Sequence, residues 1–151
     1  MVSPLPPFDP KVASKFFFQN GHVGWLGLEF LTHGENWVEL KLPWREDLLG
    51  EDDRPILASG PILSLMDMAS GISIWTTKKT YTPVATLDLR VDYQRPARER
   101  NAVIGRVECY CITRSAAFVR GIAYDDDIDD PIAHVAGVFM TISKDPRIGK
   151  F

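Results

Sequence analysis

The sequence predicts an α+β fold in which an antiparallel sheet wraps around one long, buried helix. Residues 56–76 form the most apolar segment of the chain, and their large side chains repeat with a helical period. The residues that follow change to a period of two and hold it through four successive segments. The connections between those segments are short, which favours antiparallel over parallel neighbours.

One helix and two strands are predicted before the apolar segment. The helix covers residues 8–21, with Asp9 as its N-cap, Pro10 in its first turn and Asn20–Gly21 at its end. Two strands then flank a turn over residues 33–36. A polar connector over residues 45–55 leads from the second strand to the apolar segment.

The apolar segment predicts a helix over residues 59–76 that is surrounded by protein on nearly all sides. Asp67 is the only charged residue between Pro55 and Thr77. A buried carboxylate without a partner costs several kcal/mol. Asp67 therefore either pairs with an arginine in the core or faces a site that uses its charge.

The start of this helix offers a second candidate for chemistry. The helix opens at "ASGP" (residues 58–61), where free backbone N–H groups and the positive end of the helix dipole could bind a carbonyl oxygen as it gains negative charge. The alternative is that Ser59 is only an N-cap.

Four strands follow, over residues 84–97, 101–114, 116–125 and 131–142. Strict alternation in the first of them places five residues on one face: Ala85, Leu87, Leu89, Val91 and Tyr93. The same alternation places Thr86 on the opposite face. In the next strand, Cys109 and Cys111 are expected to share a face as reduced core thiols.

Length and composition indicate one domain over residues 1–151, with residues 1–24 as a helical N-terminal extension. The net charge is −3 and no basic stripe is present, which argues against nucleic-acid binding. The N-terminus lacks the pattern of a secretory signal, and the apolar segment is too polar to span a membrane. We therefore expect a cytoplasmic protein.

Several kinds of site are excluded by their motifs. The chain has no serine-nucleophile elbow, phosphate-binding loop or dinucleotide fingerprint. Its three histidines, His22, His33 and His134, show no metal-ligand spacing. The acidic run over residues 125–130 lacks the glycine and glutamate of a calcium loop, so we expect an acidic hairpin loop and no metal site.

Three arginines lie at the end of the first of these strands and directly after it: Arg95, Arg98 and Arg100. A guanidinium group matches the geometry of phosphate oxygens, so these residues could grip a phosphate. The alternative is that they belong to a solvated hairpin.

Residues 27–142 resemble a hotdog-fold acyl-CoA thioesterase of the PaaI-like, phenylacetate-degradation branch. The resemblance rests on "GPILSLMDMASG", on "ATLDLRVDYQRPA" and on "GRVECYCITRSAAFVRGIAYDDD" followed by "PIAHVAGVFM". It implies hydrolysis of an acyl-CoA thioester to a carboxylic acid and free CoA. It implies no cofactor apart from the CoA ester that serves as substrate.

The resemblance also assigns roles to four residues. Asp67 matches the helix carboxylate that acts as general base or nucleophile, and Thr86 matches the hydroxyl that helps to place the attacking water. A backbone N–H at about Ser59, beside Gly60, matches the group that polarises the carbonyl oxygen.

In this family each site lies between two subunits, so the resemblance implies a homodimer or a homotetramer. Coenzyme A lies along the subunit boundary with basic residues near its phosphates, which here implies Arg95 and Arg98. The chain also departs from the family pattern. The usual His-Gly-Gly is Ala58-Ser59-Gly60, and Asp52 is the nearest match to an Asn or Gln expected beside the substrate.

These departures leave a second function open. The chain could be a non-catalytic binding protein of the same fold that holds an acyl-CoA or a free fatty or aryl acid. A hotdog dehydratase is a weaker third option. Those enzymes pair a carboxylate with a catalytic histidine, and no histidine lies between His33 and His134, so none is near the Asp67 helix in sequence.

Overall fold

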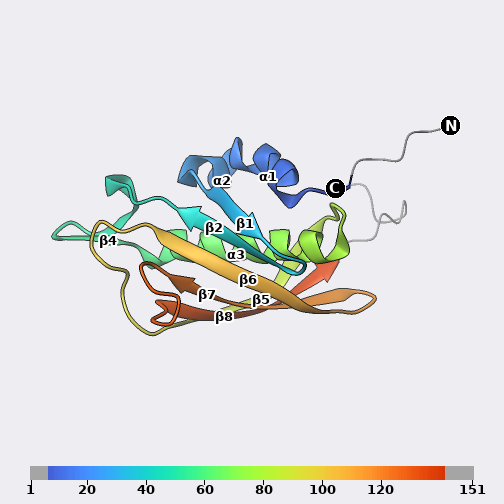
Figure 1. Ribbon diagram of the computed structural model, residues 1–151. Helices are drawn as coiled ribbons and strands as arrows, with labels where there is room; N and C mark the ends of the chain where they lie inside the picture. The colour runs from blue at the N-terminus through green and yellow to red at the C-terminus, as the bar shows by residue number, and fades with distance from the viewer. Residues whose placement is uncertain (1–6, 142–151) are drawn as a thin grey trace.

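The computed structural model describes residues 7–141 of the chain (Figure 1). In chain order, its elements are α1 (Pro10–Phe18), α2 (Gly21–Leu26), β1 (Glu29–His33), β2 (Trp37–Leu42), a short 3₁₀ turn (Glu46–Leu48), β3 (Leu49–Glu51), β4 (Arg54–Leu57), α3 (Ser59–Lys78), β5 (Val84–Tyr93), β6 (Val103–Ile112), β7 (Ala116–Tyr124) and β8 (Ala133–Thr141).

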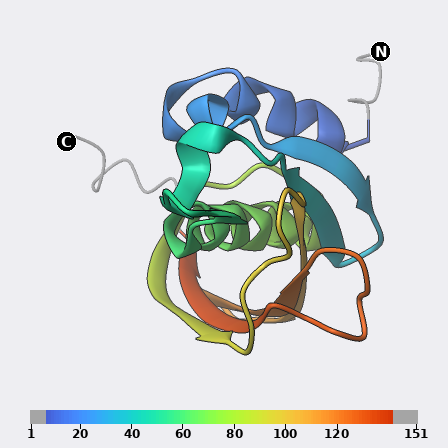
Figure 2. The same cartoon turned by 90° about the vertical axis from the view of Figure 1, so that its left-hand side faces the viewer.

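Six of the strands form one sheet in the order β1-β2-β6-β7-β8-β5, and every neighbouring pair is antiparallel. Viewed along α3, the sheet curls around the helix, and α1 and α2 lie on the side of α3 away from β7 and β8 (Figure 2). The predicted α+β fold, an antiparallel sheet around one long helix, is confirmed. The edge strands are β1 and β5.

The apolar composition of α3 explains its central position. Leu65, Met66, Ala69 and Ile72 are fully buried, and the helix packs against β2, β6 and β7. The approach to β6 is close, because a Cβ added at Gly105 would lie 2.8 Å from the Met66 sulfur. The helix extends two residues beyond the predicted end.

Two segments differ from the prediction. The single helix expected over residues 8–21 is followed by a second short helix, α2, because Gly21 (φ 62°) redirects the chain and Gly27 (φ 70°) ends the new helix. The polar connector expected over residues 45–55 instead includes β3 and the start of β4, which form a small hairpin. Leu48, just before β3, and Leu57, the last residue of β4, are both buried and hold the base of this hairpin on the core.

Two β-bulges interrupt the strict alternation predicted for β5 and β6. The first lies between Thr86 and Asp88, and the extra residue, Leu87, is 60% exposed. The second lies between Cys109 and Cys111, so Cys109 is buried whereas Cys111 is exposed, and both thiols are free. The prediction that the two cysteines share a face is therefore wrong.

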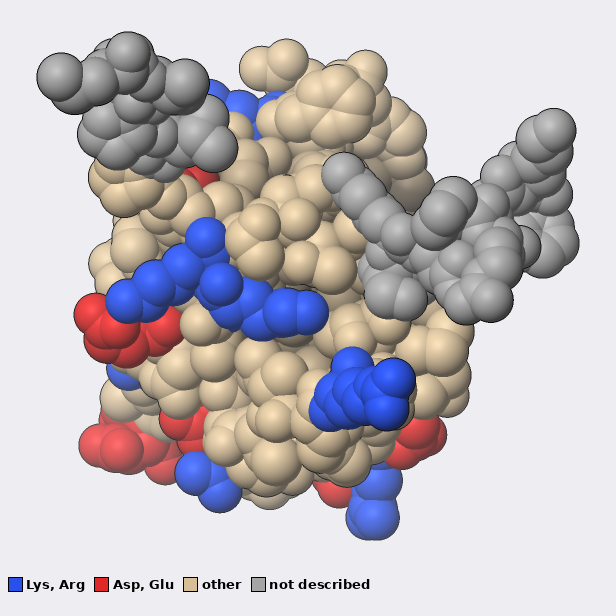
Figure 3. All heavy atoms as spheres, turned by 90° about the vertical axis from the view of Figure 1, so that its right-hand side faces the viewer, with Lys and Arg blue, Asp and Glu red and all other residues tan. Residues whose placement is uncertain are grey.

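Charged side chains are mixed with uncharged surface. On the face shown in Figure 3, lysines and arginines form separate groups with uncharged atoms between them, and acidic residues gather toward the margins. Among the helices of residues 7–141, we find none that is long and apolar enough to cross a membrane.

The close strand packing at Gly121 on β7 predicts a stability effect. A Cβ at this position would lie 2.9 Å from the Val107 Cα and closer still to the Arg106 carbonyl oxygen, both of which belong to the neighbouring backbone. We expect Gly121→Ala to lower the free energy of unfolding by roughly 1–3 kcal/mol, because the strands must separate. Urea denaturation followed by circular dichroism measures this change.

The matched control for that substitution is Gly71→Ala on α3. A Cβ at Gly71 would meet only the Val84 Cγ2 at 3.7 Å, an ordinary contact. Alanine is also the better helix former by about 1 kcal/mol. Equal stability losses in the two variants would contradict the role of strand packing at Gly121.

Candidate active site

The carboxylate of Asp67 on α3 pairs with a hydroxyl group of the edge strand β5. Thr86 Oγ1 donates a hydrogen bond to Asp67 Oδ1 at 2.8 Å. The alternative that Asp67 pairs with an arginine is wrong, since it forms no ion pair with any of residues 7–141. Asp67 is half-buried, and Thr86 is its partner.

The β5 bulge places Thr86 on the side of the strand that faces α3. Leu89 packs on the core, and Tyr93 Oη donates to the Ser59 carbonyl of α3 at 2.9 Å, so these residues also face the helix. Regular alternation would have placed Thr86 on the face opposite Leu89 and Tyr93. The extra residue in the bulge reverses that alternation and brings the hydroxyl to Asp67.

A hollow of about 360 Å³ opens beside the Asp67–Thr86 pair. Most of its wall is apolar, and its lining includes Val23, Leu63, Met68 and Leu89. Such a site, with a few polar groups set in an apolar wall, is typical of a pocket for a small organic molecule.

The N-terminus of α3 leaves backbone donors free. Its N-cap is Ala58, which has no side-chain acceptor, and Ser59 is the first helical residue. The alternative that Ser59 serves as the N-cap is therefore wrong. The N–H groups of Ser59 and Gly60 point out of the helix at its positive end, as a site for a developing negative charge requires.

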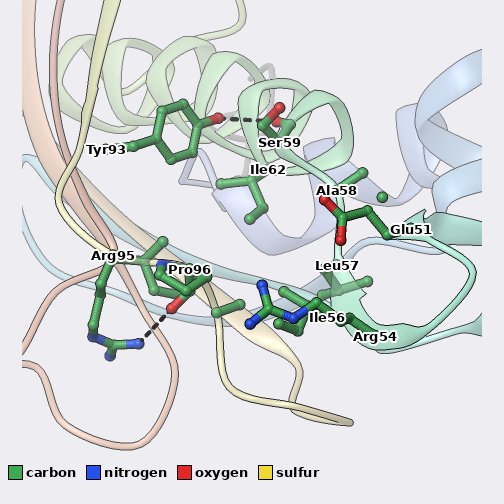
Figure 4. Close-up of a pocket in the computed structure, with 13 residues that line it drawn as sticks. Glu51, Arg54, Ile56, Leu57, Ala58, Ser59, Ile62, Tyr93, Arg95 and Pro96 are labelled. Atoms are coloured by element: carbon green, nitrogen blue, oxygen red, sulfur yellow. Dashed lines mark hydrogen bonds between the residues drawn. The ribbon is translucent and has the colours of Figure 1, made fainter.

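Two further hollows lie at this helix end, and the first of them meets the Asp67 hollow at Leu63 and Leu89. One follows the seam between α3 and β5 and is lined by Ser59, Gly60, Leu63, Leu89, Val91 and Tyr93. The other, of about 260 Å³, lies between the helix end, the β3–β4 hairpin and the loop after β5 (Figure 4). Burial beside this helix end raises the pKa of the Tyr93 phenol.

The predicted phosphate ligands Arg95 and Arg98 both pair with acidic residues of the β7–β8 loop. Each guanidinium lies 2.6 Å from Asp125 Oδ1, and both also pair with Asp130. Ion pairs therefore hold both arginines against the acidic loop over residues 125–130, and neither segment is a freely solvated hairpin loop. Arg95 lines the hollow at the helix end, whereas Arg98 does not. Their role in phosphate binding stays a prediction.

The structure places the remaining predicted residue, Asp52, in the exposed turn between β3 and β4, where it lines none of these hollows. Arg54 on the same hairpin was not singled out from the sequence, but its guanidinium points into the hollow at the helix end (Figure 4). Arg54 forms no ion pair with the described residues.

A histidine also lies beside the Asp67 hollow, which the sequence did not lead us to expect. His22 on α2 lines this hollow, and its Nε2 is 3.0 Å from Ser64 Oγ on α3. His22 precedes Ser64 by 42 residues, so sequence proximity could not identify it. Within residues 7–141, His, Cys, Asp and Glu do not gather in any group that could hold a metal ion.

The sequence profile of the thioesterase superfamily matches residues 56–132, about half of the chain. The match includes α3 and β5, which carry Asp67 and Thr86. The chain therefore belongs to the thioesterase superfamily. No curated protein matches the chain.

Solved structures agree with this assignment. A Pseudomonas aeruginosa protein is 36% identical, covers 89% of this chain and 100% of its own, and gives a TM-score of 0.80. A Haemophilus influenzae thioesterase (17% identity, 91% of this chain and 93% of its own, TM-score 0.79) shows the same fold. So does the Escherichia coli PaaI protein from the phenylacetic acid degradation operon (12% identity, 87% and 91%, TM-score 0.74). The fold is the hotdog fold.

The buried carboxylate of Asp125 predicts a pH-dependent stability. Burial by itself raises the pKa of Asp125, but hydrogen bonds from the Arg95 side chain and from the backbone N–H groups of Arg98 and Asp126 hold this pKa well below its ordinary range. We expect Asp125→Asn to lower the free energy of unfolding at pH 7 by about 3 kcal/mol, because both arginines lose their shared partner.

The sign of the pH effect follows from the lowered pKa. In the unfolded chain this carboxyl has a pKa of about 3.9, so its stabilising contribution is present above that pH and is lost as pH falls toward the folded-state pKa. The difference in the free energy of unfolding between wild type and Asp125→Asn should therefore become smaller as pH falls below about 4. Urea denaturation over a pH series tests this, with Asp53→Asn as control, because Asp53 is exposed and forms no ion pair with any of residues 7–141. A difference that stays constant would contradict the prediction.

Proposed function

We propose that this protein hydrolyses acyl-CoA thioesters to a carboxylic acid and free CoA, as a cytoplasmic enzyme of the PaaI-like branch. The observation that carries the proposal is the Asp67–Thr86 pair, set beside an apolar hollow on the central helix of a thioesterase-superfamily fold. A carboxylate held by one hydrogen bond keeps its second oxygen available to a water molecule or a substrate carbon.

The reaction needs a base or nucleophile and a stabilised oxyanion. As a base, Asp67 removes a proton from a water molecule that attacks the thioester carbonyl carbon. The carbonyl oxygen becomes negative and accepts hydrogen bonds from N–H groups at a helix N-terminus. The C–S bond then breaks, and the thiolate takes up a proton. As a nucleophile, Asp67 itself attacks the same carbon, and the C–S bond breaks to leave a mixed anhydride and a thiolate that takes up a proton. Water then hydrolyses the anhydride to release the acid and restore the Asp67 carboxylate.

One chain cannot supply both groups to one carbonyl. Ser59 and Asp67 are eight residues apart on α3, which separates them by about 12 Å along the helix axis. The oxyanion donors that act with Asp67 must then come from a second copy of the chain. We therefore propose a homodimer in which Asp67 of one chain works with the Ser59 end of α3 from the other.

The edge strand β5 suits this arrangement. Among the described residues, no strand pairs with its outer edge. Antiparallel pairing of β5 with its own copy, centred near Leu89, brings Thr86 of one chain opposite the Tyr93 end of the other. Because Thr86 contacts Asp67 and Tyr93 contacts Ser59, this pairing brings the two half-sites together.

The hollow at the helix end suits the phosphates of CoA. Arg54, Arg95 and the acidic Glu51 line it, and Arg54 forms no ion pair with any of residues 7–141, Glu51 included. A guanidinium group binds phosphate oxygens through paired hydrogen bonds. Arg54 therefore joins Arg95 and Arg98 as a candidate phosphate ligand.

The first test measures thiol release from short-chain, long-chain and aryl acyl-CoAs by wild type and by Asp67→Asn. We expect turnover of at least one ester by wild type and a loss of roughly 10²–10⁴-fold in the variant, because the amide is neither base nor nucleophile. An Asp67→Asn variant with full activity would remove Asp67 from the mechanism. Tight binding of acyl-CoA without thiol release by wild type would instead identify a binding protein.

A second test addresses the shared site. Ser59→Pro removes one N–H donor while the backbone tolerates proline, because Ser59 is the first helical residue and Ala58 is already extended (φ −65°, ψ 156°). We expect Ser59→Pro and Asp67→Asn homodimers each to be nearly inactive. Co-expressed at equal levels, they should recover about a quarter of wild-type activity, because half of the dimers are mixed and each holds one intact site.

The control is Ser59→Ala, which keeps the backbone donor and should lose far less activity than Ser59→Pro. No recovery in verified mixed dimers would show that both groups act from the same chain.

A further inference from the structure

The hydrogen bond between His22 and Ser64 stands between two hollows. Both side chains line the hollow beside Asp67, and both also line a neighbouring hollow of about 410 Å³ over the first turns of α3. They are the only two residues that the two linings share. Their side chains, joined at 3.0 Å, therefore form the wall between these two spaces.

The second hollow is suited to an apolar group. Its lining comes from α2, from the β3 region and from the start of α3. Most of it is apolar, including Trp25, Leu26, Leu48, Leu49 and Pro61, and Asp47, which bonds to Arg45, also lies in it. Leu26 and Leu48 are buried beneath it, whereas Trp25 is 54% exposed. A large exposed aromatic ring beside buried leucines offers an apolar surface that a ligand can cover.

The His22–Ser64 wall is supported by contacts on the side of Trp25. The His22 ring stacks on Trp25, with ring centroids 6.1 Å apart. The Arg45 guanidinium lies 5.2 Å from the Trp25 ring centroid and donates to the Trp25 carbonyl oxygen at 2.6 Å. Asp47 in turn holds Arg45 through two hydrogen bonds. His22 is itself exposed, and these contacts support its ring on the side of Trp25.

We propose that the hollow under Trp25 is a subsite for the distal part of the substrate's acyl group, and that the His22–Ser64 hydrogen bond sets which acyl groups reach it. This inference rests on the proposed thioesterase function. A thioester carbonyl beside Asp67 directs its acyl chain into an apolar space that ends at this wall. A short acyl group fits in front of the wall, and a long one must displace it.

The energetics favour a large effect of chain length. Each methylene that leaves water for an apolar surface improves binding by about fourfold. When the His22–Ser64 hydrogen bond is in place, the distal methylenes cannot reach the apolar surface and do not contribute to binding. When it is absent, they can. Removing the imidazole should therefore benefit long acyl groups and leave short ones with little gain.

The test compares dodecanoyl-CoA with butyryl-CoA by thiol release in wild type and in His22→Ala. We expect the ratio of kcat/KM values, long over short, to rise at least about tenfold in His22→Ala. Adding Trp25→Ala to that variant should reverse most of the rise, because it removes the surface that the chain covers. His22→Gln, which can still bond to Ser64, should stay near the wild-type ratio.

The matched control is His33→Ala, because His33 is an exposed histidine on β1 that lines neither hollow. It should leave the ratio as in wild type. A ratio in His22→Ala within twofold of wild type, with turnover intact, would overturn the subsite and leave the thioesterase function standing.

Binding of S-butyl-CoA and S-dodecyl-CoA, measured by calorimetry, gives the same comparison without turnover. A selective gain for S-dodecyl-CoA in His22→Ala, with no thiol release from any ester, would support the subsite in a binding protein. Absence of both thiol release and thioether binding would reject the proposed function and the subsite together.

Discussion

The hydrogen bond from Thr86 to Asp67 is the interaction on which the arrangement of the site depends. It gives the one carboxylate of an otherwise uncharged helix segment a partner, and an unpartnered group in that position would be costly. It also joins α3 to β5, as the hydrogen bond from Tyr93 to Ser59 does at the other end of the strand. The bond exists only because the bulge at Leu87 turns Thr86 toward the helix.

A second set of contacts holds the other end of the seam. Arg95 and Arg98, which follow β5, share the buried carboxylate of Asp125, which follows β7. The composition of the loop after β5 and of the loop after β7 suggests two solvated loops. Because their opposite charges pair with each other, the two loops pack together instead. The network fixes the chain just after Tyr93 and so fixes one wall of the hollow at the helix end.

The sequence was sufficient to predict the order of the main elements, the central helix and Asp67 as the residue to explain, because these follow from periodicity and from one misplaced charge. It could not predict the bulges. In β5, for example, apolar and polar residues alternate in the sequence without a break from Ala85 to Tyr93, although the bulge lies at Leu87. Strict alternation placed Thr86 away from α3, and only the resemblance to thioesterases pointed to it. His22 was missed because its contact with Ser64 depends on how α2 folds back.

The proposed division of the site between two chains accounts for features that a single chain leaves unexplained. An edge strand with exposed apolar side chains, such as Leu87 and Tyr93, invites pairing unless something covers it. A straight helix with the proposed oxyanion donors at one end and a carboxylate two turns later cannot apply both to one small group. A two-fold axis at β5 resolves both, because the second copy covers the edge and brings its helix end to Asp67.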